Sequence, residues 1–148
     1  MLSAEFRVVR VKPERLRGTI EIWRGGERVA VSDRERTIVD ALVDPGWVGG
    51  VRHLAEILVT YRRSPEFDVP KLIARLAEVD SGAAYKRIGY LAEALWPGAS
   101  SIVEVALAHR PQGVIRLDPA VRSRGRMNKR WGLWVNAAIS SEPGADDS

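Results

Sequence analysis

Residues 81–98, SGAAYKRIGYLAEALWPG, predict a long helix at the centre of the fold. Ser81 is a favourable N-cap, and Pro97-Gly98 ends the helical pattern. Apolar residues recur at the spacing of one helical face, namely Ala84, Ile88, Leu91 and Leu95. Gly89 lies in mid-helix, where it costs about 1 kcal/mol relative to alanine unless a neighbouring group packs closely against it.

The segments on both sides of this helix are also predicted to be helical. Ser32 followed by Glu35 is a capping-box pattern, and the helix that it begins should end at Asp44-Pro45-Gly46. A second helix is expected over about residues 51–62, and Asp68 should cap a third that has Pro70 in its first turn. The apolar run SSIVEVALA at 100–108 favours a fifth helix, with a buried strand as the alternative.

Both ends of the chain predict β-strands. Near the N-terminus, EFRVVRVK, GTIEIW and ERVAVS are strand-like, and Arg24-Gly25-Gly26 suits a tight hairpin turn between the last two. Near the C-terminus, GVIRLD and RWGLWVN are strand-like, with Trp131, Leu133 and Val135 on one face. The element order predicts an α+β fold, in which N- and C-terminal strands share one mixed or antiparallel sheet packed against four or five central helices. Residues 1–140 should form a single domain, and the acidic tail at 141–148 should be disordered.

Composition excludes several classes of protein. The 148 residues contain no cysteine, which removes disulfides and cysteine-based zinc sites and fits a cytoplasmic protein. No apolar run approaches a membrane span, and the first residues lack the apolar core of a signal peptide. The formal net charge is +4, and 19 of the 23 cationic residues are arginine, which suits contact with phosphate or carboxylate.

The positive charge is concentrated in AVRSRGRMNKRWGLWVN, residues 120–136. This segment, called the basic arm below, has five basic residues and no acidic residue. Such an arm, with an aromatic residue interleaved, can contact phosphates and stack on bases, but it can equally be a strand connection kept soluble by its charge. If the terminal strands pair, the N-terminal cations would join the arm in one surface. The candidate nucleic-acid- or partner-binding residues are Lys86, Arg87, Arg122, Arg124, Arg126, Lys129, Arg130 and Trp134.

Patterns of catalytic chemistry are weak in this sequence. It contains no phosphate-binding glycine loop, dinucleotide fingerprint or nucleophile elbow, and its two histidines, His53 and His109, lie in separate predicted elements. The segment PEFDVPK at 65–71 has the letters of a metal-nuclease site, but Pro70 breaks the strand that such a site uses, so Asp68 is interpreted as a helix cap. We therefore expect no enzyme activity, no cofactor and no metal.

Three stretches in order resemble the C-terminal region of AbiEi-type antitoxins, which are transcriptional regulators of type IV toxin–antitoxin systems of abortive infection. They are VAVSDRERTIVDALVDP…GG at 29–50, YKRIGYLAEAL at 85–95, and IRLDP…NKRWGLWVN at 115–136. The resemblance covers roughly residues 5–137. Members of this family usually carry a winged helix before this region, but no helix-turn-helix pattern precedes Glu5. The chain is therefore expected to be either a fragment, a product of a misassigned start site, or a stand-alone relative.

The resemblance implies a non-catalytic α+β domain that assists transcriptional autoregulation and neutralises a nucleotidyltransferase-like toxin. Its basic surface would contact DNA phosphates without reading bases by itself. The alternative is a protein-interaction module with no nucleic-acid role, anchored by an aromatic residue such as Trp47 or Tyr90. A third hypothesis is a metal-dependent nuclease that uses Asp68, Glu66 or Glu104. No membrane partner is expected.

Overall fold

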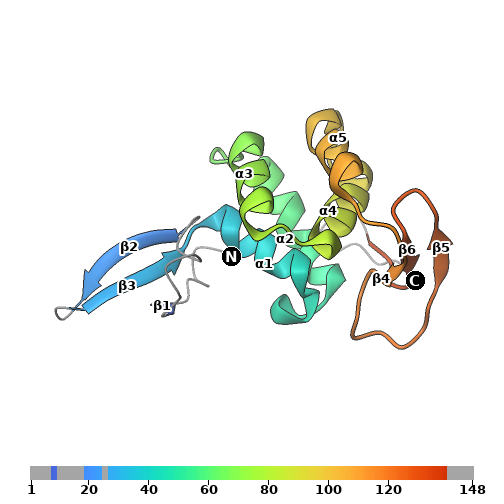
Figure 1. The fold of residues 1–148 in the computed structure, drawn as a ribbon, viewed down its shortest axis with the longest axis horizontal. Coiled ribbons are helices and arrows are strands. Elements are labelled where there is room, and N and C mark those ends of the chain that lie inside the picture. Colours follow the sequence, from blue (N-terminus) through green and yellow to red (C-terminus); the bar gives the residue numbers. More distant parts are fainter. Residues whose placement is uncertain (1–7, 10–18, 25–26, 140–148) are drawn as a thin grey trace.

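The computed structural model describes the backbone of residues 8–9, 19–24 and 27–139, and the side chains of residues 33–139. Two small sheets flank a cluster of helices, which confirms the α+β class (Figure 1). In chain order, the elements are β1 (Val8–Val9), β2 (Thr19–Arg24), β3 (Glu27–Ser32), α1 (Arg34–Val43), α2 (Val51–Arg63), α3 (Val69–Val79), α4 (Gly82–Leu95), α5 (Ser100–His109), β4 (Ile115–Arg116), β5 (Arg126–Asn128) and β6 (Leu133–Val135). A 3-10 helix at Pro45–Val48 joins α1 to α2.

The helix boundaries follow from the capping residues. The side chain of Asp68 accepts a hydrogen bond from the Lys71 amide at the start of α3, and Ser81 accepts one from the Ala84 amide at the start of α4, as predicted. At the start of α1 the cap is Asp33, not Ser32, because Ser32 still pairs in β3. The ambiguous segment at 100–108 is a helix, α5.

Helix α4 is the centre of the core. It packs against α1, α2 and α5, and its predicted apolar face, Ala84, Ile88, Leu91 and Leu95, is buried. The face of α2 is also largely buried, with Leu54, Leu58 and Tyr61 in the core. Such a continuous apolar interior is the main source of stability in a domain of this size. Among the described residues, no helix combines the length and apolar character that a bilayer crossing requires.

The predicted sharing of one sheet by the two ends of the chain is wrong. The N-terminal strands form a sheet in the order β1-β3-β2, and the C-terminal strands form another in the order β4-β6-β5. Figure 1 places these sheets at opposite ends of the helical cluster. The physical reason is that the packed helices lie between the two sheets, so the strands of one cannot reach the edges of the other. Within the C-terminal sheet, β6 pairs parallel to β4 and antiparallel to β5. The described strands therefore do not merge the N-terminal cations with the basic arm.

The N-terminal hairpin itself follows the prediction, since β2 and β3 pair antiparallel from Thr19↔Ser32 to Arg24↔Glu27. The side chains of this hairpin and the acidic tail at 141–148 lie outside the described residues. The third C-terminal strand, β5, was not predicted, and it lies within the basic arm.

Candidate nucleic-acid interface

The buried guanidinium of Arg87 joins three segments of the chain. Its Nη1 donates to the carbonyls of Leu42 and Val43 at 2.9 Å each. These carbonyls lie in the last turn of α1, where the helix itself provides no donor for them. Nε donates to the Leu117 carbonyl and Nη2 to the Arg116 carbonyl, each at 3.0 Å. Arg87 thereby caps α1 and holds β4 against α4. Burial lowers the pKa of Arg87, an effect that nearby carboxylates oppose.

Lys86 makes a similar attachment one residue earlier. Its ammonium donates to the Gly113 carbonyl at 2.6 Å and approaches the Gly132 carbonyl at 3.4 Å. These carbonyls precede β4 and β6, so Lys86 holds the starts of both strands. Burial, helped by the positive charge of Arg110, lowers the pKa of Lys86.

The prediction that Lys86 and Arg87 belong to an exposed basic surface is therefore wrong. Lys86 is 1% exposed and Arg87 is 4% exposed. Cations beside an apolar helical stripe usually remain in solvent, but here backbone carbonyls from the C-terminal sheet replace the water around them. Both residues support the sheet that bears the arm, and neither is available to bind a polyanion.

Gly89 provides a third attachment by leaving room for an indole ring. A Cβ atom at this position would overlap the six-membered ring of Trp131, which is fully buried. The indole Nε1 donates to the Glu93 carboxylate at 2.9 Å, and Arg130 forms an ion pair with the same carboxylate at 2.7 Å. The close neighbour that would justify a mid-helix glycine is therefore present. Burial acts to raise the pKa of Glu93, but hydrogen bonds from Trp131 and Arg130 outweigh it and hold that pKa below its ordinary value.

Asp118 fixes the other end of the arm and was missed in the sequence. Its Oδ2 accepts a hydrogen bond from the Val51 amide at 3.1 Å, at the start of α2, where the N-cap Gly50 offers no side chain. A carboxylate at a helix N-terminus interacts favourably with the helix dipole. Asn136, just after β6, accepts from the Asp118 amide and donates to the Asp118 carbonyl, both at 2.9 Å. The only sequence signal for this contact is the uncapped Gly49-Gly50 before α2.

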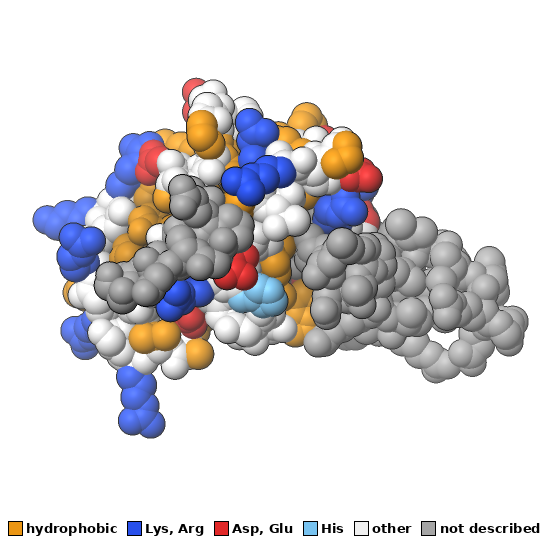
Figure 2. Space-filling view, turned by 180° about the vertical axis from the view of Figure 1, so that it is seen from behind, with side chains coloured by type: hydrophobic (Ala, Val, Ile, Leu, Met, Phe, Trp, Pro, Cys, Tyr) orange, Lys and Arg blue, Asp and Glu red, His pale blue; other side chains and the backbone are white. Residues whose placement is uncertain are grey.

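All five cations of the arm are exposed on this framework, and Arg130 is already paired with Glu93. The other four are Arg122, Arg124, Arg126 and Lys129. Within the part of the chain that the structure describes, none of these four forms an ion pair. Lysine and arginine side chains project along the left margin of Figure 2, at the end of the molecule where Figure 1 places the C-terminal strands. The predicted site residues are thus divided into a buried pair, which supports the sheet, and an exposed set, which is available to a ligand.

Arg130 and Trp134 do not form the predicted pair on one strand face. Arg130 lies before β6, where it contacts Glu93 and the ring of Trp131. The ring of Trp134 is instead covered by Arg124, whose guanidinium carbon lies 5.6 Å from the ring centroid. The β6 strand begins only at Leu133, so residues 130 and 134 do not share a continuous extended segment.

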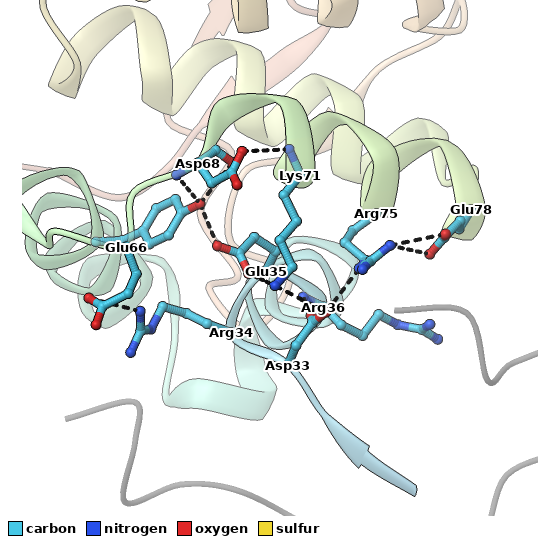
Figure 3. A network of polar contacts seen from close by, with 10 residues as sticks. Asp33, Arg34, Glu35, Arg36, Glu66, Asp68, Lys71, Arg75 and Glu78 are labelled. Carbon is cyan, nitrogen blue, oxygen red and sulfur yellow. Dashed lines mark hydrogen bonds and ion pairs between the residues drawn. The ribbon is translucent and has the colours of Figure 1, made fainter. Parts of the chain in front are cut away.

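A second polar cluster joins the start of α1 to one side of α3 (Figure 3). Arg75 donates to Asp33 at 3.0 Å, while Lys71 lies 3.5 Å from Glu35. Tyr61 donates its hydroxyl to Glu35 at 2.7 Å, and burial together with this carboxylate raises the Tyr61 pKa. Each buried carboxylate here has a cation beside it, so the cluster is accounted for as a structural network.

The residues of the nuclease hypothesis do not converge. Asp68 caps α3, Glu66 contacts Ser64 and Arg34, and Glu104 is an exposed residue of α5. In residues 33–139, no three histidine, cysteine or acidic side chains are grouped as a metal site would require.

The two histidines and the aromatic residues suggested as anchors contact other groups within the fold. His109 stacks on Tyr85 with ring centroids 4.8 Å apart, and His53 contacts the Val48 carbonyl. Trp47 and Tyr90 are partly buried and packed against the core.

Three segments distant in sequence, residues 29–50, 85–95 and 115–136, meet in space around Arg87. The first stretch supplies the carbonyls of Leu42 and Val43, the second supplies Arg87, and the third supplies the carbonyls of Arg116 and Leu117. A comparison of the chain with protein-family models, curated proteins and solved structures found no match.

Proposed function

We propose that this chain is a non-catalytic regulatory domain of the antitoxin type, which binds nucleic-acid phosphates through the exposed cations of its basic arm. The observation that supports this most directly is the group Arg122, Arg124, Arg126 and Lys129, which is exposed and has no acidic neighbour in sequence from residue 119 to residue 139. Nucleic-acid backbones bind such groups by releasing condensed counterions.

The framework beneath the arm supports the same proposal. Lys86, Arg87 and Gly89 lie within two turns of α4, and all three contact the C-terminal sheet or the residues just before its strands. The sheet is thereby attached to the most buried helix, so the arm extends from a fixed base. A fixed base reduces the conformational entropy that is lost when the exposed side chains contact a ligand.

The resemblance to AbiEi-type antitoxins supplies the remaining parts of the proposal. By this resemblance, the domain acts in the cytoplasm, assists autoregulation of its own operon, and neutralises a nucleotidyltransferase-like toxin. The phosphate contacts of the arm would position the domain on DNA but would not select a sequence.

Salt-dependent DNA binding tests the phosphate contacts. Affinity for a labelled duplex should fall as salt rises, and the double variant Arg122→Gln/Lys129→Gln should reduce the slope of log affinity against log salt by up to about 0.9 for each lost contact. The matched control is Arg62→Gln/Arg63→Gln, which removes the same charge at the far end of α2. Equal slopes for the two variants would contradict the assignment of the arm.

Toxin neutralisation requires a separate measurement. Co-expression with a nucleotidyltransferase-like toxin should restore bacterial growth, and the two proteins should co-purify. A complex that resists high salt, together with no duplex binding at low salt, would contradict the DNA role and favour the protein-interaction alternative.

A further inference from the structure

The outer face of the C-terminal sheet presents a row of side chains that crosses all three strands. In the strand register, Trp134 of β6 is paired with Arg116 of β4 on one side and with Met127 of β5 on the other. Residues directly paired in neighbouring strands project to the same face of a sheet. The adjacent residue Leu133 is fully buried toward the helices, so the row of Arg116, Trp134 and Met127 faces away from them.

Trp134 lies outside the hydrophobic core, unlike the other tryptophans whose side chains the structure describes. The other tryptophans with described side chains are buried in the core, as Trp96 and Trp131 are, or packed against it, as Trp47 is. Trp134 is half-buried but belongs neither to the core cluster nor to the side chains packed against that cluster. Beside it, Met127 is 38% exposed. An aromatic ring with an apolar neighbour on an open sheet face is a platform on which a planar ligand can stack.

The surroundings of this platform determine the charge of its ligand. Arg116 lies in the row, Arg122 and Lys129 lie on the adjoining arm, and all three side chains are exposed. Arg124 covers the Trp134 ring from a segment without regular secondary structure, so its long side chain can leave the ring. A ligand that combines a flat ring with closely spaced negative charges fits both features, and unpaired nucleotides have this chemistry.

We infer that the row of Arg116, Trp134 and Met127 binds a base of single-stranded nucleic acid. The base stacks on Trp134, Met127 contacts its edge, and the flanking phosphates contact Arg116 and the arm. Arg124 exchanges its ring contact for a phosphate contact when the base enters. A duplex keeps its bases stacked on one another, so it can reach the arm but not this platform. This inference rests on the proposed function, because the same arm cations bind the phosphates.

Binding measurements on the full chain test the inference. The probes are a labelled oligothymidylate and an oligouridylate of about twelve nucleotides, and a duplex of the same length, at low salt. Trp134→Ala should weaken binding of the single strands by roughly 5- to 150-fold and leave duplex affinity unchanged. Trp134→Phe should retain most of the affinity, because a smaller ring still stacks. Whichever single strand binds more tightly identifies the ligand as DNA or RNA.

Two controls separate this inference from the proposed function. Arg122→Gln/Lys129→Gln should weaken binding of all three probes, whereas the loss caused by Trp134→Ala should be confined to single strands. Far-UV circular dichroism should show an unchanged fold for Trp134→Ala, because the side chain lies outside the core. Unchanged single-strand affinity in that variant, or binding of the duplex alone, would overturn the inference and leave the proposed function standing. Failure to bind any of the probes would overturn both.

Discussion

Replacing Gly89 with alanine sets two effects of opposite sign against each other. Alanine in a helix interior is favoured over glycine by about 1 kcal/mol, so helix propensity alone predicts stabilisation. The new methyl group would, however, overlap the ring of Trp131, whose Cε3 atom would lie 2.7 Å from the added Cβ. The ring sits between α4 and the C-terminal sheet and is fully buried, so it cannot move without disturbing the packing.

The cost of the steric overlap with Trp131 should exceed the gain in helix propensity. Overpacking in a core typically costs about 1 to 3 kcal/mol. A displaced ring would also lose its hydrogen bond to the Glu93 carboxylate, which contributes about 1.5 kcal/mol for a charged acceptor. After subtraction of the propensity gain, Gly89→Ala should lower the free energy of unfolding by about 1.5 to 3.5 kcal/mol.

Urea unfolding followed by circular dichroism measures this change. For an m-value of about 2 kcal/mol per molar urea, the midpoint should fall by about 1 to 2 M. Ala94→Gly, at an exposed position of the same helix, calibrates propensity alone and should cost about 1 kcal/mol. In a Trp131→Leu background, Gly89→Ala should become neutral or stabilising. A higher unfolding free energy for Gly89→Ala in the wild-type background would refute the reasoning.

Three further variants test the attachment of the sheet. Arg87→Ala leaves buried carbonyls unpaired and should cost about 4 kcal/mol in thermal unfolding. Glu93→Gln should lower stability at neutral pH by at most about 1 kcal/mol, because the carboxylate is partly exposed. The pKa of Glu93 is depressed on folding, so this difference should vanish as the pH falls below 4.5 and through the folded-state pKa. Gly125→Ala should cost about 1 to 3 kcal/mol and expose the β5 amides to hydrogen exchange, because Gly125 has φ of 69° and an added Cβ would overlap the Val135 carbonyl.

Each of these variants has an outcome that contradicts its premise. Wild-type stability in Arg87→Ala would mean that the guanidinium bonds contribute nothing net. A pH-independent difference for Glu93→Gln would exclude ionisation of the carboxylate as its source. Unchanged exchange at Arg126 and Met127 in Gly125→Ala would show that β5 tolerates a side chain at that turn.

The helices were predictable because their signals are local. Asp68 and Ser81 act as caps with the nearest amides, and the apolar face of α4 is a spacing within one element. The predicted N-cap of α1 was wrong by one residue, because Ser32 pairs with Thr19 and so belongs to β3. Such tertiary contacts override local preference at element ends.

The candidate site was predictable only in part, because its arrangement depends on contacts between distant segments. The positive charge of the arm can be read from the sequence, and the structure shows that the cations of this segment are exposed. The burial of Lys86 and Arg87 depends on carbonyls that lie 27 to 46 residues away, which no helical periodicity can indicate. The pairing of Trp134 with Met127 likewise depends on β5, a strand too short for a sequence pattern.

The bonds of Arg87 also constrain the order of folding. Its acceptors lie 29 to 45 residues from it in sequence, on both the N-terminal and C-terminal sides. Forming contacts between residues so far apart in sequence closes large loops, which costs conformational entropy. This cost is offset only when the helices that the loop brings together are already formed and can pack. We therefore expect the C-terminal sheet to dock late, onto α1 and α4 that are already packed. The row of Arg116, Trp134 and Met127, which comes from three different strands, would then form only in molecules whose helical cluster is complete. A nascent or partly unfolded chain would carry the charge of the arm but would lack the surface on which a base stacks.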